Sequence, residues 1–439
     1  MNKSSLKITV LIPVKNRIDY LRATINTCVN QEYDNLEIII ADDFSDEPIE
    51  DFVQQVAQTH KWVKYVKPPS PGGMRNNFEF ALGLVTEGYV MFLGSDDGLI
   101  PGAIREIAKK LSQEKIDLMC WDPAIYYYPG VRNESGQIVL PLQKISSGLT
   151  SSSIVLSSLA NSLNYVTESR LPMIYVKGIV AVSLISSIRA KNPDKRFFQC
   201  ATPDGFSGIT LLGYCKKFYY STEAFTIYGS SSGSQGSAYL SNTTTAKALS
   251  DEFFRQSLQI PMHRELGSAP YSPLITLMTA DYLLRAVDLP GWQGTVSLDY
   301  RRVITMAIKE LSHGLYAPER VVREMEIIQT IAQHHKIEKI FMNSAIRIRK
   351  NNCNYPFRGD GSNMKSIFID CAGHKINGIL DAAYFCKTIS SIRKTFKVKR
   401  FITAIVESVR YKIQLKCRGQ RMAIYLQIDP NGIDLGTKK

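Results

Sequence analysis

The fold class is decided by residues 7–43, which read KITVLIPVKNRIDYLRATINTCVNQEYDNLEIIIADD. The apolar, β-branched runs at 7–14 and 36–41 predict two buried strands. Between them, apolar side chains recur at helical spacing over 18–31, and Asp19 lies where a carboxylate favours the positive end of a helix. The stretch therefore predicts a strand, a helix and a second strand that stops at two adjacent aspartates.

The same alternation continues further along the chain. The next expected elements, helix and strand in turn, are 49–60, 62–66, 75–86, 89–93, 102–112 and 116–121. Strands that are apolar throughout are typical of a parallel sheet with helices on both faces, and ligands bind such sheets outside the carboxyl ends of the strands. No GxGxxG follows the first strand and no GxxxxGK[ST] occurs, which disfavours a dinucleotide oxidoreductase and a P-loop phosphotransferase.

Composition suggests two or three domains in the 439 residues. We expect an α/β body over 1–240 that ends at the Ser- and Gly-rich run 230–238, a mainly helical domain over 241–345, and a basic extension over 346–439. The extension holds 19 Lys and Arg against 6 Asp and Glu, and the other residues balance. A basic segment is drawn to anionic lipid, nucleic acid or phosphorylated partners. Since no recognisable nucleic-acid motif is present, no nucleic acid is expected.

The eight cysteines form no CxxC pair, which predicts reduced thiols and disfavours a zinc site. The N-terminus lacks the apolar core of a secretory signal, and no uncharged apolar run approaches about 18 residues. We expect the protein to lie in the cytoplasm. Attachment to the inner face of a membrane is an additional prediction. The pair His334–His335 has charged neighbours on an expected helix, which favours a solvated face over a metal site.

Two aspartate pairs stand at two expected strand ends. Asp42–Asp43 follows the second strand, and Asp96–Asp97 follows the fourth. Adjacent carboxylates repel each other and are favoured where a cation or hydrogen-bond donors compensate them. Oxygen ligands of this kind suit Mg²⁺ or Mn²⁺. The alternative is that these carboxylates cap helices or stabilise turns.

Strand, DD, RN and DD occur in order over ITVLIPVKNRIDYLRATINTCVNQEYDNLEIIIADDFSDE and GGMRNNFEFALGLVTEGYVMFLGSDDGLIPGAI. This sequence resembles the family 2 glycosyltransferases, which are inverting enzymes that use nucleotide-diphosphate sugars. The resemblance is dense over 7–110 and thin beyond about 130. It implies a GT-A fold, that is, a Rossmann-like, mostly parallel sheet with helices on both faces, in a catalytic domain over 1–240. The mainly α-helical region follows it.

The resemblance also implies roles for single residues. Pro13 and Lys15 match positions that line the nucleotide pocket, and Asp43 matches a carboxylate that accepts hydrogen bonds from the base. Arg75 and Asn76 match an Arg-Asn pair that assists nucleotide binding.

The second aspartate pair stands at the family's DxD-type motif. Asp97 corresponds to the metal ligand, and Asp96 approaches the ribose or the waters of the metal. Ser95 replaces the usual first aspartate, which leaves the full coordination sphere open. An inverting transfer also needs a base, and Asp204 in FFQCATPDGFSGITLLGY is the expected one, with Asp194 as the alternative. A helix cap is the structural alternative for Asp204.

The expected function is transfer of a sugar from a nucleotide-diphosphate donor, by default a UDP-sugar, to an acceptor hydroxyl with inversion. A divalent metal, Mn²⁺ or Mg²⁺, would assist. The expected acceptor is a glycan or a lipid-linked sugar in a bacterial surface-polysaccharide pathway, with the basic extension at an anionic membrane. The loop at 230–238 is expected either to close over the diphosphate or to act as a linker. The alternative function is a non-catalytic nucleotide-sugar-binding protein that recruits a partner through its basic extension.

Overall fold

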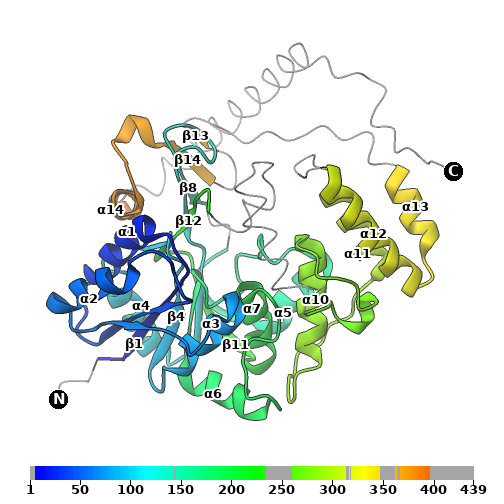
Figure 1. The fold of residues 1–439 in the computed structure, drawn as a ribbon, viewed down its shortest axis with the longest axis horizontal. Coiled ribbons are helices and arrows are strands. Elements are labelled where there is room, and N and C mark those ends of the chain that lie inside the picture. The colour runs from blue at the N-terminus through cyan, green and yellow to red at the C-terminus, as the bar shows by residue number, and fades with distance from the viewer. Residues whose placement is uncertain are drawn as a thin grey trace.

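The computed structural model describes residues 5–142, 145–233, 260–312, 316, 318–346, 361–362 and 366–395. Its first half alternates strands and helices (Figure 1). The elements up to the fourth strand are β1 Ile8–Val14, α1 Ile18–Val29, β2 Leu36–Asp42, α2 Ile49–Thr59, β3 Val63–Val66, α3 Gly73–Gly83 and β4 Tyr89–Phe92. They are followed by β5 Gly98–Leu99, α4 Ala103–Glu114 and β6 Leu118–Trp121. Every helix and strand predicted up to residue 121 is confirmed, with ends that shift by a few residues.

The main sheet has eight strands in the order β3-β2-β1-β4-β10-β6-β11-β9. The first four are mutually parallel, and β11 (Lys217–Ser221) is parallel to β6. Two antiparallel strands interrupt this pattern, namely β10 (Gly178–Ala181), between β4 and β6, and β9 (Gly148–Ser151), on the edge. The predicted α/β class with a mostly parallel sheet is confirmed, and the antiparallel insertion is a feature that the sequence did not reveal.

Both faces of this sheet are buried, which explains why its strands are apolar throughout. In β1, Ile8, Val10 and Ile12 belong to one buried cluster, and Leu11 belongs to the other. The first cluster includes side chains of α1, α4 and α14 (Ile379–Thr395), and the second includes side chains of α3, α5 and α7. The helices not yet bounded here are α5 Ser152–Ser162, α6 Val182–Lys191 and α7 Pro203–Tyr214.

A second sheet has six strands in the order β13-β14-β8-β7-β12-β5. Its remaining strands are β7 Ala124–Tyr127, β8 Gln137–Pro141, β12 Thr226–Ser230, β13 Gly361–Ser362 and β14 Ser366–Asp370. The sequence did not reveal this sheet, because its strands are short and their partners lie far apart in the chain. Its importance for the site is that β12 pairs with β5, directly after the Asp96–Asp97 pair.

The region after residue 260 is mainly helical, as predicted. It contains α10 Ile275–Val287, α11 Tyr300–Leu311, α12 Pro318–His334 and α13 Glu338–Ile346, which share a third buried cluster. Helix α10 also packs on α7, and α14 lies beside α1 (Figure 1). Residues 366–395 of the predicted basic extension therefore contact the α/β body, while 347–360, 363–365 and 396–439 fall outside the described residues.

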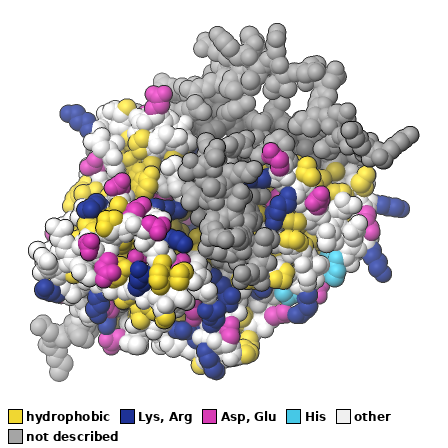
Figure 2. Space-filling model, viewed as in Figure 1, with side chains coloured by type: hydrophobic (Ala, Val, Ile, Leu, Met, Phe, Trp, Pro, Cys, Tyr) yellow, Lys and Arg dark blue, Asp and Glu magenta, His cyan; other side chains and the backbone are white. Residues whose placement is uncertain are grey.

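Surface charge on the α/β body is mixed rather than segregated. On the face in Figure 2, dark blue and magenta side chains are interspersed. Among the described residues, no helix combines the length and the apolar character needed to cross a membrane. None of the six cysteines in this part of the chain forms a disulfide.

Candidate active site

The first aspartate pair is buried at the carboxyl end of β2, where its hydrogen bonds hold neighbouring segments in place. Asp42 accepts hydrogen bonds from the Ser45 N–H (3.0 Å) and the Tyr65 hydroxyl (2.8 Å). The two carboxylate oxygens of Asp43 accept from the N–H groups of Gly72 (2.8 Å) and Gly73 (2.9 Å). Because Gly72, the N-cap of α3, has no side chain, Asp43 caps this helix from another element.

The turn after β1 lies level with the end of β2. Pro13 pairs with Ala41 in the sheet and is half-buried, and Lys15 is exposed. Asn16 and Arg17 follow in the left-handed region, with φ of 60° and 67°. The Asn16 side chain accepts a hydrogen bond from the backbone of the β2–α2 loop, which fixes this turn against the carboxyl end of β2.

Arg17 is a functional candidate that the sequence interpretation missed. Its charge lowers the pKa of Asp96, against the larger effect of burial, and its guanidinium donates to the Gly233 carbonyl. It was given no role in the sequence interpretation, because it precedes the expected helix over 18–31. The signal that could have found it is its place directly after β1, at the same sheet edge as both aspartate pairs.

The second aspartate pair lies at the end of β4 beneath residues that follow β12. The Asp97 carboxylate accepts from the N–H groups of Gly94 (2.6 Å) and Gly229 (2.8 Å). Asp96 accepts from the Ser231 hydroxyl (2.6 Å). Burial, and then the neighbouring charge of Asp96, raise the pKa of Asp97, and burial also raises the pKa of Asp96. This pair therefore carries a buried negative charge that is incompletely compensated.

The chemistry of this pair fits a divalent cation. Two carboxylates in one buried place provide the hard oxygen ligands that Mg²⁺ and Mn²⁺ prefer, and a cation would relieve their repulsion. Ser95 is also buried there, and its carbonyl accepts from Thr24 of α1 (2.8 Å), which fixes the loop between β4 and β5. The residues that could hold the ion are thus Asp96 and Asp97.

Asp204 lies in the first turn of α7, after Pro203 at the helix start. One carboxylate oxygen accepts from the Tyr165 hydroxyl (3.4 Å), and the other is buried and has no hydrogen-bond partner among the described residues. Burial raises the pKa of Asp204. The alternative, Asp194, is exposed, and its carboxylate accepts hydrogen bonds from the Arg196 N–H and the Gln199 side chain. Asp204 therefore has the surroundings of a proton acceptor.

Two tyrosines, Tyr175 and Tyr228, are affected by the charges of all three carboxylates. Burial raises the pKa of Tyr175 and of Tyr228, and the charges of Asp97, Asp96 and Asp204 raise both further. The structure thus brings Asp96, Asp97 and Asp204 into one neighbourhood, although Asp204 follows the pair by over one hundred residues. The tyrosines carried no signal in the sequence, because only the fold brings them to these carboxylates.

The predicted Arg-Asn pair lies in the first turn of α3 and faces the segment before α7. The Arg75 guanidinium donates through Nε to the Phe198 carbonyl (2.9 Å), and the Asn76 side chain accepts from Arg196 (2.8 Å). Helix α3 therefore links the capping carboxylate Asp43 to the segment that leads into Asp204.

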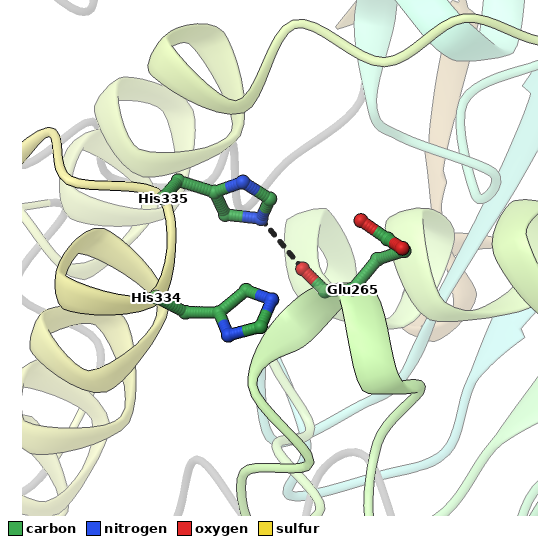
Figure 3. A group of neighbouring side chains, drawn as sticks. All are labelled: Glu265, His334 and His335. Atoms are coloured by element: carbon green, nitrogen blue, oxygen red, sulfur yellow. Dashed lines mark hydrogen bonds between the residues drawn. The ribbon is translucent and has the colours of Figure 1, made fainter.

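A separate group lies in the helical region, as Figure 3 shows. Ligand atoms of Glu265, His334 and His335 are within 4.8 Å of one another. His335 Nε2 lies 2.6 Å from the backbone carbonyl oxygen of Glu265, at hydrogen-bond distance (Figure 3). His335 also stacks on Tyr300, with 3.6 Å between ring centroids. These contacts are typical of a solvent-exposed helix face on which one histidine ring packs, and they favour that interpretation over a metal centre.

The fold and these strand-end carboxylates define an α/β protein whose candidate ligand site lies at the carboxyl edge of its parallel strands. Residues 9–157 match the model of "Glycosyl transferase family 2". This match confirms, for residues 9–157, the resemblance to the family 2 glycosyltransferases seen in the sequence.

Curated relatives match about a quarter of the chain. A GalNAc(5)-diNAcBac-PP-undecaprenol beta-1,3-glucosyltransferase of Campylobacter jejuni is 31% identical over 111 residues, which are 24% of this chain and 35% of that protein. Glycosyltransferase GlyA of Streptococcus pneumoniae is 27% identical over 114 residues, 26% of this chain and 16% of that protein. The chain thus spans about a third or less of the length of these relatives.

Among solved structures, S. aureus TarS 1-349 in complex with UDP has a TM-score of 0.41 at 15% identity, over 78% of this chain and 90% of that one. The mannosyltransferase PcManGT from Pyrobaculum calidifontis, in complex with GDP-Man and Mn²⁺, has a TM-score of 0.38 at 11% identity, over 79% and 88%. A likeness of this degree identifies neither donor nor acceptor for this chain.

Proposed function

We propose that this chain transfers a sugar, with inversion, from a nucleotide-diphosphate donor to an acceptor hydroxyl. The observation that carries the proposal is the presence of two kinds of carboxylate: the buried, adjacent Asp96 and Asp97 at the end of β4, and Asp204 at the start of α7, with one buried oxygen that has no partner in the described part of the chain. A buried carboxylate pair and a third carboxylate with a raised pKa suit two different roles in one reaction.

The donor half of the site is the carboxyl edge of β1, β2 and β4. Pro13, Lys15 and Asp43 surround the place for the nucleoside, where Asp43 has capacity to accept hydrogen bonds beyond the two from α3. A UDP-sugar is our first choice of donor. Asp97, with Asp96 beside it, would hold Mn²⁺ or Mg²⁺, which when bound neutralises charge on a leaving diphosphate.

The acceptor half is the start of α7. Asp204 takes the proton from the attacking hydroxyl through its unpartnered oxygen, while Tyr165 holds the other oxygen in place. Because burial raises the pKa of Asp204, its ionised form is a stronger base than an ordinary aspartate. Arg75 and Asn76 position the substrate from α3.

For the acceptor we propose a glycan or a lipid-linked sugar of a bacterial surface polysaccharide. The name of the Campylobacter relative, which specifies a PP-undecaprenol-linked glycan, supports this choice. We further propose that residues 346–439, with their excess of Lys and Arg, hold the protein at the anionic inner face of a membrane. Equal sedimentation with anionic liposomes by the full chain and by a version ending at Gln333 would reject the membrane proposal.

The test of the function is calorimetric titration of UDP with and without Mn²⁺, followed by a screen for donor hydrolysis and transfer. We expect Mn²⁺-dependent UDP binding that Asp97→Ala loses, and turnover that Asp204→Asn loses. If the protein binds none of the three nucleotides UDP, GDP and dTDP, the proposal is overturned. Binding without any turnover would favour a non-catalytic nucleotide-sugar-binding protein.

A further inference from the structure

Two arginines meet between α3 and the segment 192–200 that precedes α7. Arg75 donates to the Phe198 carbonyl (2.9 Å), and Arg196 donates to the Asn76 side chain (2.8 Å). Each guanidinium thus reaches into the segment that carries the other. Burial, and then the positive charge of Arg196, lower the pKa of Arg75, as expected for two like charges at close range.

The acidic groups around these arginines have other partners. Glu79 accepts from the N–H groups of Phe197 and Phe198 and forms an ion pair with Arg189 (3.1 Å). Asp194 accepts from the Arg196 backbone N–H and from Gln199. Within the described part of the chain, no carboxylate lies within 4.0 Å of either the Arg75 or the Arg196 guanidinium. The two cations are therefore held together without an ion pair, an arrangement that an anion would stabilise.

The position of the pair connects it to the acceptor half of the site. Arg75 donates to the carbonyl of Phe198, six residues before Asp204, and α3 contacts α7, the helix that carries Asp204. By contrast, the cation that faces Asp96 is Arg17. The arginine pair therefore lies toward Asp204, while Arg17 lies toward the candidate metal site.

We propose that Arg75 and Arg196 form a phosphate clamp at the edge of the active site. A guanidinium is a planar fork of N–H donors that matches the oxygens of a phosphate, and the bonds that brace the pair leave other donors on each fork. The phosphate comes either from the diphosphate of the donor or from a phosphorylated acceptor. The assignment to a substrate rests on the proposed function, whereas the binding of phosphate does not.

The test is a titration of the full-length protein with inorganic phosphate at low ionic strength. Arg196→Gln removes the charge and retains a side-chain donor for Asn76, so the segment before α7 stays in place. Lys195→Ala is the matched control, because it removes the adjacent charge and loses only a bond to the Ala190 carbonyl. We expect phosphate affinity to fall at least fivefold in Arg196→Gln and less than twofold in Lys195→Ala. Equal losses in both variants, or no phosphate binding by the unchanged protein, would overturn the clamp.

A second arm identifies the source of the phosphate. With UDP and Mn²⁺ at saturation, loss of phosphate binding assigns the clamp to the donor diphosphate, and retention assigns it to a phosphorylated acceptor. If UDP, GDP and dTDP all fail to bind while Arg196→Gln still weakens phosphate binding, the proposed function fails and the clamp stands.

Discussion

The two aspartate pairs have the same sequence and the same place at a strand end, yet their surroundings differ. Asp43 accepts two backbone N–H groups at the start of α3, where the helix dipole favours a negative charge. Asp97 shares a fully buried place with Asp96, and its pKa is raised to about 8. The comparison teaches that a carboxylate pair at a strand end can have either of two roles. Hydrogen bonds of the fold can stabilise it, or it can be suited to bind a cation, and the groups around the pair determine which role it has.

The largest expected effect is on turnover, and it distinguishes Asp96–Asp97, which we expect to bind the metal, from Asp42–Asp43, which we do not. In Asp97→Ala, turnover should fall by roughly 10⁴-fold, since a cation contributes several kcal/mol and each 1.4 kcal/mol is about tenfold. Chelation of the metal should reproduce this loss in the unchanged protein. In Asp43→Asn, the residual UDP binding should still increase with Mn²⁺. Calorimetry of all three proteins checks this, and equal metal dependence in Asp97→Ala and the unchanged protein would contradict it.

The next effect concerns Asp204, the carboxylate with one buried oxygen in the first turn of α7. Asp204→Asn should reduce turnover by about 10³-fold, within the range for loss of a general base, and leave UDP affinity unchanged. Its folded pKa is raised, so ionisation of Asp204 destabilises the folded state above that pKa. The variant should therefore be at least as stable as the unchanged protein at pH 7. A large drop in the melting temperature would indicate a structural role instead.

The pH dependence offers a finer comparison. The base must be ionised, so kcat/KM should rise with pH through the raised pKa of Asp204, above the ordinary aspartate range near ~3.9. The hydrogen bond from Tyr165 lowers this pKa, against the effect of burial. Tyr165→Phe should therefore move the acidic limb of the profile to higher pH. An unchanged limb, with kcat reduced equally at every pH, would contradict a role for Tyr165 in setting this pKa.

The sequence predicted the part of the fold that local pattern controls. The helices and the main-sheet strands up to Trp121 were predicted because apolar runs and helical spacing act over a few residues, whereas the two-residue β5 was not. The acidic strand ends were predicted for the same reason. What the sequence could not show are contacts between distant segments, such as Gly229 on Asp97, 132 residues away, and Arg17 on Gly233, 216 residues away. The arginine pair was hidden for the same reason.

A smaller effect should measure how much the first pair contributes to stability. Asp43→Ala removes the acceptor for the N–H groups of Gly72 and Gly73, which no side chain of α3 caps. The loss should destabilise the protein by about 1–3 kcal/mol, the range for a lost cap and unsatisfied donors. Chemical denaturation checks this, with Asp43→Asn, which retains one acceptor oxygen, as the intermediate control.

The smallest expected effect tests whether Asp42, at the end of β2, stabilises the fold without contributing to nucleotide binding. Tyr65 donates its hydroxyl to Asp42 at 2.8 Å, and Tyr65→Phe removes this one hydrogen bond. Since the ring stays in place, the cost should be about 1 kcal/mol, a shift of the melting temperature by a few degrees at most. UDP affinity and its metal dependence should not change, because Asp43 keeps both of its bonds to α3. If Tyr65→Phe weakened UDP binding more than threefold, Asp42 would belong to the nucleotide site, and the contrast between the two pairs would be one of degree rather than of role.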